Sequence, residues 1–248
     1  MIYVCIPAHN EGRTIGVLLW KIRNTLGEFS RDYRILVHDD ASTDDTQAVL
    51  ERYQRVLPLT LLGSQDRVGY GRSVEKLLRH VVENASYPKR DCAVILQGDF
   101  TENPDDVISL VKMLEGGADI VAGVTDMNGH RMPLGVKIVR SLSRWPLSTV
   151  FRGAPVSDPL NGLRAYRVIV LKKALRDGPG DEPLVRTEGW AANVELLSRL
   201  VPHARRIAEV PAEVRHDLRQ RESRFRPLST LMALMKLRRR DLWPTSNP

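Results

Sequence analysis

The residues best suited to chemistry lie in one polar turn, Gln97-Gly98-Asp99, which follows the apolar run Val94-Ile95-Leu96. That run has the composition of a buried strand, and Pro104 opens a helical pattern shortly afterwards. A carboxylate placed where a buried strand ends is a group that α/β proteins use to hold a metal ion or a phosphate ester. Asp99 is therefore the first candidate functional residue, with Gln97 beside it.

Polar residues follow three other apolar runs in the same way. They are His9, Asn10 and Glu11 after Ile2–Pro7, Asp39 and Asp40 after Tyr33–His38, and Gln65 and Asp66 after Leu57–Leu62. Because the carboxyl ends of parallel strands meet at one edge of a sheet, we expect these groups to lie together. Their agreement predicts a binding site along that edge.

Strand-like and helix-like segments alternate along the first half of the chain. This alternation predicts an α/β protein with a mostly parallel central sheet and helices on both faces. The expected helices include 15–26, 74–81 and 104–114, and a fifth strand is expected over 118–124. In the less regular second half we expect a helical stretch over 131–151, a turn and short strand over 158–167, a helix after Trp190 and a short strand over 206–211.

The composition is that of an ordinary globular protein, with 248 residues, 42% hydrophobic and 27% charged. Cys5 and Cys92 both sit in apolar runs and are expected to be buried free thiols, which fits a reducing compartment. The chain begins directly with a strand, without a signal-peptide pattern. No apolar stretch approaches the ~20 residues of a membrane span. We therefore expect a cytoplasmic protein.

The net charge of +7 is concentrated near the C-terminus, because residues 204–240 contain eleven Lys and Arg against four Asp and Glu. This asymmetry indicates a local anionic target, either substrate phosphates or an anionic membrane surface. Few aromatic residues lie among these arginines for base stacking, so no nucleic-acid partner is expected.

Residues 227–248 are predicted to form a basic amphipathic helix, over 227–240, and a tail. Such a helix can lie peripherally on the cytoplasmic face of a membrane. It can equally cover a face of the sheet or contact a partner subunit. The oligomeric state is left open by the sequence.

Five motifs occur in the order seen in glycosyltransferase family 2, and they resemble most closely its dolichol-phosphate or polyprenyl-phosphate hexose (mannose) synthase branch. They are Pro7-Ala8-His9-Asn10-Glu11, Asp39-Asp40-Ala41-Ser42-Thr43-Asp44-Asp45-Thr46, Gly69-Tyr70-Gly71, Gln97-Gly98-Asp99 and Asn161-Gly162-Leu163-Arg164-Ala165-Tyr166. Each motif is weak by itself, but five in order are specific. The resemblance covers residues 1–225.

This resemblance implies a GT-A fold over residues 1–226. Its Rossmann-like nucleotide-sugar-binding half would span 1–125 and its acceptor half 126–226. The implied reaction is inverting transfer of a hexose from a nucleoside diphosphate sugar, GDP- or UDP-hexose, to a polyprenyl (dolichol-type) phosphate. The implied partners are that nucleotide sugar and the lipid-linked phosphate acceptor.

The resemblance also assigns roles on the nucleotide side. Pro7, His9, Glu11, Asp40, Gly69, Gln97 and Asp99 match nucleotide-sugar-binding positions, and Asp40 matches the aspartate that contacts the base. Asp99 matches the last carboxylate of the family's Asp-x-Asp element, which holds Mg²⁺ or Mn²⁺ on the diphosphate; hard oxygen ligands suit these ions. Gln97 replaces the first aspartate, which weakens the expected cation site.

The catalytic candidates are Asp99, Asp158 and Arg164. On the acceptor side, the candidates for binding the diphosphate or the acceptor phosphate are Arg131, Arg164, Arg219 and Arg224. The forked guanidinium suits phosphate recognition. The loop over 216–224 is similar to the family's Arg-x-x-Gly-x-Ser-Lys loop, but lacks its glycine. Asp158 can alternatively accept hydrogen bonds within its own turn.

Two alternative functions stay open. Thr187-Glu188-Gly189-Trp190 is similar to the Glu-Asp-Trp element that supplies a base in hydroxyl-accepting relatives, so transfer to a saccharide or small-molecule hydroxyl is one alternative. Gly189 replaces the second acid, and an ionised phosphate acceptor needs no base, which favours the phosphate. The other alternative, suggested by Gln97, is a nucleotide-sugar-binding module without turnover.

Several of these residues also have purely structural explanations. The two aspartates after the second strand can form an exposed turn with a helix cap. Glu11 can be an acid favoured by a helix dipole, and His9 can face solvent. Gly69 and Gly71 can serve backbone shape alone.

Overall fold

The computed structural model describes residues 1–125, 152–178, 182–213, 227–237 and 242–243. The elements in chain order are β1 (Ile2–Ala8), α1 (Ile15–Gly27), β2 (Tyr33–Asp40), α2 (Thr46–Gln54), β3 (Leu59–Ser64), α3 (Tyr70–Asn84), β4 (Cys92–Ile95), α4 (Asp106–Glu115), β5 (Ile120–Thr125), β6 (Arg164–Arg167), α7 (Val168–Arg176), α8 (Trp190–Leu200), the 3₁₀ helix η1 (Val201–His203), β7 (Ile207–Ala212) and α9 (Pro227–Leu237). The expected helical stretch over 131–151 lies outside the described residues.

The described strands form one sheet in the order β3-β2-β1-β4-β6-β5-β7. Strands β1, β2, β3 and β4 run parallel to one another, and β5 is parallel to β7. Only β6, among the described strands, runs antiparallel to its neighbours β4 and β5. The expected mostly parallel α/β sheet is confirmed.

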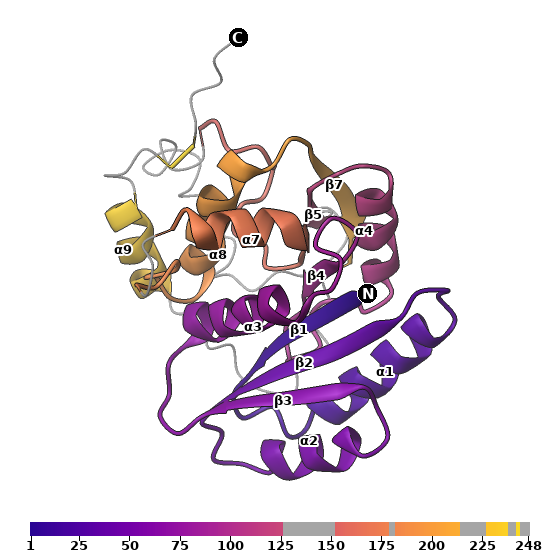
Figure 1. The fold of residues 1–248 in the computed structure, drawn as a ribbon. Helices are drawn as coiled ribbons and strands as arrows, with labels where there is room; N and C mark the ends of the chain where they lie inside the picture. Colours follow the sequence, from indigo (N-terminus) through magenta and orange to yellow (C-terminus); the bar gives the residue numbers. More distant parts are fainter. Residues whose placement is uncertain (126–151, 179–181, 214–226, 238–241, 244–248) are drawn as a thin grey trace.

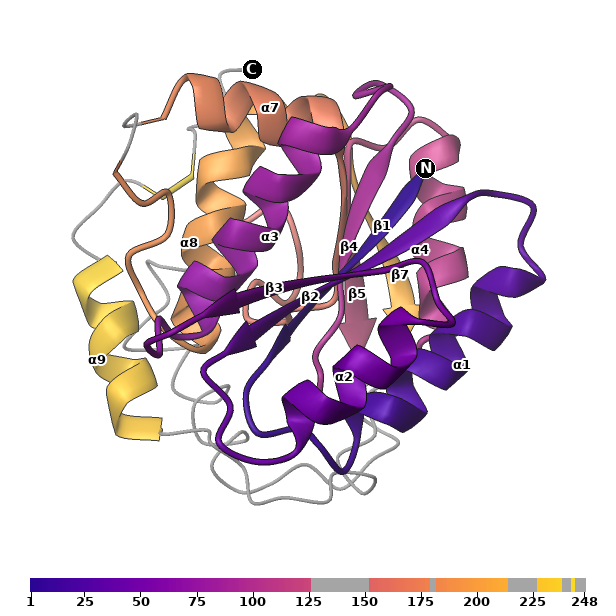
Figure 2. The ribbon, with the colours of Figure 1, turned by 60° about the horizontal axis from the view of Figure 1, so that its bottom comes forward.

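Helices cover both faces of this sheet, as Figures 1 and 2 show. One core layer packs β1 residues Tyr3 and Cys5 against α3, α7, α8 and α9. The other packs Ile2, Val4 and Ile6 of the same strand against α1, α2 and α4. Because successive side chains of a strand point to opposite faces, a strand covered on both sides must be apolar throughout. This explains the continuous apolar run at the start of the chain.

The register places the carboxyl ends of the central strands side by side. Ala8 at the end of β1 pairs with Asp39 of β2, and Asp39 pairs in turn with Gly63 of β3. Strand β4 lies on the other side of β1, with Cys5 paired to Ile95. The polar residues that follow these strands therefore start from one edge of the sheet.

One described helix was not expected from the sequence. Helix α7 begins directly after β6, with Arg167 as its extended N-cap residue and no intervening turn. It buries Val168, Val170, Leu171 and Ala174, which follow helical spacing. A strand that passes straight into a helix leaves no Gly or Pro signal between them, and the two elements read as one segment.

The two cysteines are free and buried, as expected, and burial raises the pKa of both thiols. Within the described part of the chain, no helix combines the length and the apolar character needed to cross a membrane.

Candidate active site

The ends of β1 and β4 are in direct contact. The Thr14 hydroxyl, at the start of α1, donates to the Gly98 carbonyl at 3.1 Å and lies 3.4 Å from Glu11 Oε2. A side chain at Gly98 would lie 3.2 Å from the Pro7 carbonyl and 3.4 Å from Glu11 Cγ. Glycine at position 98 therefore allows the strand-end turns of β1 and β4 to approach closely.

The turn after β4 holds two buried acids. Asp99 accepts hydrogen bonds from the Thr101 amide at 3.2 Å and the Thr101 hydroxyl at 2.6 Å. Between them, Phe100 has φ +61°, a left-handed conformation that costs a non-glycine residue free energy. Glu102 accepts the Gln97 backbone amide at 2.8 Å and its side-chain Nε2 at 3.4 Å. Both acids are 2% exposed.

Burial has a large effect on Glu102. It raises the pKa of the Glu102 carboxyl to about 8. The negative charge of Asp99 also raises this pKa, whereas the hydrogen bonds from Gln97 lower it. A carboxyl group with such a pKa is a frequent feature of functional sites.

The start of α3 is held by the aspartate at the end of β2. Asp40 accepts the backbone amides of Val68 at 2.6 Å and Gly69 at 2.9 Å. Arg67 lies nearby, with Nε 3.9 Å from the Asp40 carboxylate. Asp40 thus fixes the loop that enters α3, and its expected contact with the base stays a prediction.

Glu188 lies on the other side of the same glycines. Gly71 donates its amide to Glu188 Oε2 at 3.4 Å, while a Cβ on Gly69 would be 2.5 Å from that oxygen. Gly69 has φ +88°, so its backbone conformation requires glycine, whereas the Glu188 carboxylate is the end of a flexible side chain that could move aside. Burial raises the pKa of Glu188, and Asp40 adds to the shift. Positions 69 and 71 thus have the structural role that the sequence left open.

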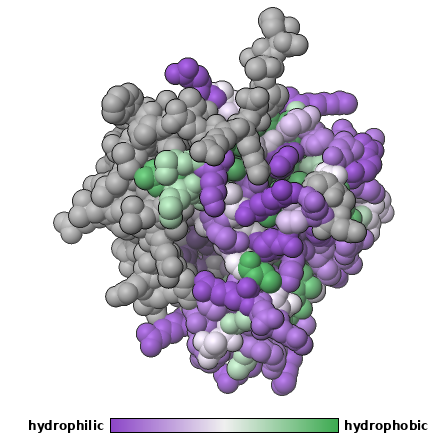
Figure 3. Space-filling model, turned by 90° about the vertical axis from the view of Figure 1, so that its left-hand side faces the viewer, coloured by the Kyte–Doolittle hydropathy of each residue, from purple (hydrophilic) through white to green (hydrophobic). Residues whose placement is uncertain are grey.

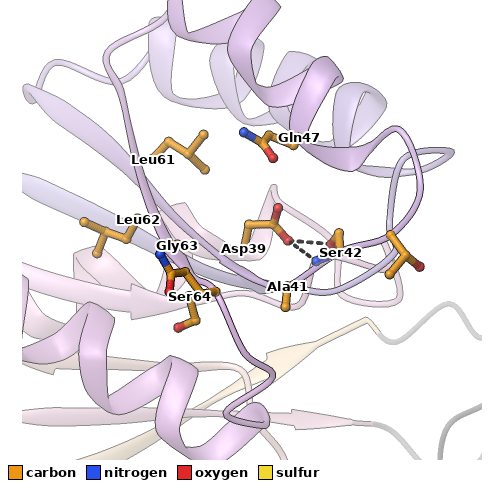
Figure 4. Close-up of a pocket in the computed structure, with 10 residues that line it drawn as sticks. Asp39, Ala41, Ser42, Gln47, Leu61, Leu62, Gly63 and Ser64 are labelled. Carbon is orange, nitrogen blue, oxygen red and sulfur yellow. Dashed lines mark hydrogen bonds between the residues drawn. The ribbon is translucent and has the colours of Figure 1, made fainter.

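Asp39, not Asp40, lines a surface pocket at the ends of β2 and β3 (Figure 4). The pocket has a volume of about 570 Å³ and is lined also by Ser42, Gln47, Leu61 and Gly63. Asp39 accepts the Ser42 hydroxyl at 2.5 Å and its amide at 3.1 Å. This pocket combines a carboxylate with apolar walls, as small-molecule sites commonly do.

The loop after β1 is tied to the loop after β2. His9 Nδ1 lies 2.7 Å from the Asp40 carbonyl, so His9 has a structural partner. Asn10, at φ +50°, donates its amide to Ser42 Oγ at 2.8 Å. The Glu11 amide donates to Thr46 Oγ1 at 2.8 Å, and Glu11 itself is buried. The structure therefore brings His9, Glu11 and Asp40 together.

Arg164 is not on the acceptor surface. It is 0% exposed, and its Nη1 donates to the Asn193 carbonyl at 2.6 Å while Nη2 donates to the Pro159 carbonyl. This corrects the expected position: the guanidinium is used inside the protein to anchor the turn before β6. A phosphate-binding role for Arg164 has no support in this geometry.

The turn anchored by Arg164 nevertheless reaches the site. Asp158 accepts the Leu160 amide at 3.2 Å within its own turn, as the structural alternative proposed. A Cβ on Gly162 would be 3.0 Å from the Tyr70 hydroxyl and 3.5 Å from Gln97 Nε2. The hydroxyl of Tyr70 donates to Asn193 Oδ1 at 2.9 Å. Both halves of the chain thus meet beside Gln97.

Three predicted residues, Arg131, Arg219 and Arg224, lie outside the described residues. Their phosphate-binding roles stay predictions.

Comparison with known proteins identifies the family. The family model described as Glycosyl transferase family 2 matches residues 3–175. The chain belongs to glycosyl transferase family 2. Its fold agrees, since glucosyl-3-phosphoglycerate synthase from Mycobacterium tuberculosis, solved with Mn²⁺, UDP and glucosyl-3-phosphoglycerate, superimposes with a TM-score of 0.65 at 22% identity over 99% of this chain and 81% of that one. S. aureus TarS 1-349 gives a TM-score of 0.54 at 17% identity, over 85% and 59% of the two chains. The fold is therefore GT-A.

Curated relatives of this family 2 member are similar at lower coverage. Undecaprenyl-phosphate 4-deoxy-4-formamido-L-arabinose transferase of Pseudomonas fluorescens (strain Pf0-1) is 25% identical over 69% of this chain and 48% of the relative. The enzyme of the same name from Pseudomonas syringae pv. syringae (strain B728a) is 23% identical over 82% of this chain and 58% of the relative. The chain spans about half the length of the curated relatives it matches.

The β4 turn carries Asp99, the carboxylate that the resemblance assigns to a divalent cation. Among the described residues, no group of three or more His, Cys, Asp or Glu could hold a metal ion by itself. Mg²⁺, however, is usually bound through one or two carboxylates together with substrate phosphates and water. Asp99 offers such a carboxylate, and the family's neighbours solved with UDP and Mn²⁺ or Mg²⁺ share the fold.

Sequence reasoning assigned no role to Glu102, Tyr70 or Asn193, and no separate role to Asp39, which lines the pocket. An acid in a turn before a proline is usually solvated, so Glu102 gave no signal. Tyr70 and Asn193 come from helices far apart in the chain, and only the fold brings their side chains together. For the two aspartates, strand alternation places successive side chains on opposite faces, but does not say which face is open.

Proposed function

We propose that this chain transfers a hexose, with inversion, from a nucleoside diphosphate sugar to a polyprenyl phosphate. One observation carries the proposal: Asp99, Glu11 and the Asp39–Asp40 pair lie at the adjacent carboxyl ends of β4, β1 and β2. Open α/β sheets bind nucleotides at this edge. The pocket lined by Asp39 would receive the base, and the Asp99 turn the diphosphate.

The chemistry required is a single displacement at the anomeric carbon. A phosphate oxygen of the acceptor forms the new bond to that carbon from the face opposite the leaving group. The bond to the nucleoside diphosphate breaks, its oxygen takes the electron pair, and the configuration inverts. Asp99 would hold Mg²⁺ or Mn²⁺, which when bound neutralises the charge that develops on the diphosphate.

Two observations support a phosphate as the acceptor. The relatives are named for transfer to undecaprenyl phosphate. In addition, the Glu188 carboxylate accepts the Gly71 amide at the start of α3, which is the contact of a helix cap. A phosphate acceptor is already ionised and needs no general base from the protein.

The direct test measures release of nucleoside diphosphate from UDP- and GDP-hexoses, with Mn²⁺, in the presence and absence of undecaprenyl phosphate. We expect release that depends on the lipid phosphate, and a loss of about 100-fold or more in Asp99→Asn, as when a transition-state charge partner is removed. Asp105→Asn is the matched control, because Asp105 is the N-cap residue of α4 and pairs with Lys21 at 2.7 Å.

Full activity of Asp99→Asn would contradict the site assignment. Tight binding of a nucleotide sugar without turnover over hours would instead support the non-catalytic binding module.

A second candidate function is transfer to a hydroxyl acceptor. It is favoured by Glu188, an exposed acid beside Gly69 whose pKa is raised by partial desolvation toward the range of a general base. Glu188→Gln separates the two functions. A loss of turnover of about 100-fold would indicate a hydroxyl acceptor, whereas a small change would support the phosphate.

A further inference from the structure

Glu102 contacts one residue twice. Its Oε2 accepts the backbone amide of Gln97 at 2.8 Å, and its Oε1 accepts the side-chain Nε2 of the same residue at 3.4 Å. The side chain is 2% exposed, so water does not compete for these contacts. Hydrogen bonds in the low-dielectric interior of a protein are stronger than hydrogen bonds in water. Glu102 therefore closes the turn 97–102 at its base.

The closed turn contains the residue assigned to the diphosphate. Asp99 is held within it by Thr101, and Phe100 adopts its left-handed conformation there. A strained residue persists only where its surroundings over-determine it. The contacts of Glu102 with Gln97 join the two ends of this turn.

The side-chain amide of Gln97 also faces Gly162. Its Nε2 is 3.5 Å from where a Cβ on Gly162 would stand, and the Tyr70 hydroxyl is 3.0 Å from that same point. The Glu102 oxygen accepts the hydrogen bond from Gln97 Nε2, so it faces the NH₂ end of the amide. The Gln97 oxygen is consequently turned away from Glu102.

We propose that Glu102 is a positioning residue of the donor site: its carboxylate sets the orientation of the Gln97 amide and closes the turn that presents Asp99. The proposal rests on the proposed function, because Asp99 is taken to meet the diphosphate. It adds a residue outside the five sequence motifs. Each Glu102 oxygen takes one hydrogen bond from Gln97, whereas an amide at position 102 offers only one oxygen.

An exchange of the two side chains tests this role. In Glu102→Gln the new NH₂ group faces Gln97 Nε2, so the Gln97 amide must flip and present NH₂ where its oxygen was. In Gln97→Glu alone, two buried carboxylates face each other and repel. In the double variant Gln97→Glu/Glu102→Gln, the amide donates to the carboxylate, and an oxygen again points away from position 102.

The measurement is calorimetric affinity for UDP and for GDP in the presence of Mn²⁺, with unfolding followed in parallel. We expect each single variant to bind the nucleotide that wild type prefers about tenfold or more weakly. The affinity of the double variant should return to within about threefold of that of wild type. Glu115→Gln is the matched control, because Glu115 is an exposed acid that pairs with Arg31 at the far end of α4.

Wild-type affinity in Glu102→Gln would overturn the proposal, and so would a folded double variant without recovery. If a single variant fails to fold, recovery of both folding and binding in the double variant is still required. Failure of wild type to bind either nucleotide would contradict the proposed function itself. Binding by wild type and by all variants alike would contradict only the role of Glu102.

Discussion

Asp99 and Glu102 belong to one turn, yet their surroundings differ. Asp99 receives two hydrogen bonds from Thr101. Glu102 is enclosed by the protein, with burial as the first cause of its raised pKa. Two acids of one turn that have different surroundings can have separate roles. In the proposed function Asp99 meets the charged diphosphate, and Glu102 supports the turn that carries Asp99.

At the residue scale, the raised pKa of Glu102 predicts a pH-dependent stability. Its folded pKa of about 8 lies above the ordinary 4.5, so between these pH values the folded state binds a proton that the unfolded state has lost. Stability from this group is therefore full below about pH 4.5 and falls as the pH rises toward 8. We expect the stability of wild type relative to Glu102→Gln to decrease from pH 5 to pH 8.

Urea denaturation of both proteins at several pH values measures this difference. Comparing the two proteins removes the opposite contribution of His38, whose pKa is lowered by burial. A difference that stays constant between pH 5 and pH 8 would show that Glu102 does not titrate in this window.

At the element scale, the loop before α8 is held by two buried acids. Glu75 of α3 accepts the amides of Leu184 and Val185 at 3.0 and 3.2 Å. Glu195 of α8 accepts the amides of the next two residues, Arg186 and Thr187, at 2.8 Å each. Successive backbone amides bound in this way fix the loop that delivers Glu188 to the start of α3.

The close packing of this loop on α3 predicts the effect of Gly71→Ala. A Cβ there would lie 2.5 Å from the Thr187 carbonyl and 3.0 Å from a Val185 methyl, and backbone cannot move aside as a side chain does. We expect a loss of about 1–3 kcal/mol in the free energy of unfolding, as for overpacked sites. Chemical denaturation measures this loss.

Gly27→Ala is the matched control. Gly27 ends α1, and a Cβ there meets nothing within 4 Å, so the substitution should leave stability unchanged or raise it by less than ~1 kcal/mol. Equal stability of the two alanine variants would mean that the loop over 184–188 moves freely away from α3.

At the scale of the whole molecule, α9 joins the core through one face. Leu234 and Leu237 are buried and the helix packs on α8, while Met232 and Met235 are 55% and 46% exposed. Figure 3 views the molecule from the α9 side, where the described residues show small separate apolar patches among hydrophilic residues. The sequence left three alternatives for this helix: membrane contact, cover of the protein's own fold, or contact with a partner subunit. The structure shows the helix packed on the protein itself. Peripheral membrane contact through the outer face remains our proposal.

This proposal predicts that Met232→Glu with Met235→Glu lowers flotation with vesicles rich in phosphatidylglycerol, because burial of two apolar side chains is lost and negative charge faces an anionic surface. We expect a decrease of about tenfold or more in the bound fraction. Trp20→Glu on α1 is the control, since Trp20 is equally exposed but lies on the opposite helical layer. Unchanged flotation of the double variant would discard membrane contact through α9.

Much of the fold and part of the site follow from local sequence. The apolar run Ile2–Pro7 had to be a strand covered on both faces, and the acids at Glu11, Asp40 and Asp99 had to start from one edge of a parallel sheet. The order of five motifs was enough to identify the family, which the match over residues 3–175 confirms. These features depend on neighbours in the chain, and periodicity and strand ends record such neighbours directly.

Burial and long-range pairing were decided only by the tertiary structure. Arg164 has the residue type of a phosphate ligand, but the fold encloses it against the carbonyls of Asn193 and Pro159. Glu102 looks like a solvated turn acid, but the packing of the turn removes its water and directs its carboxylate onto Gln97. A charged group's role depends on its solvent and on partners distant in sequence, which residue type and spacing do not specify.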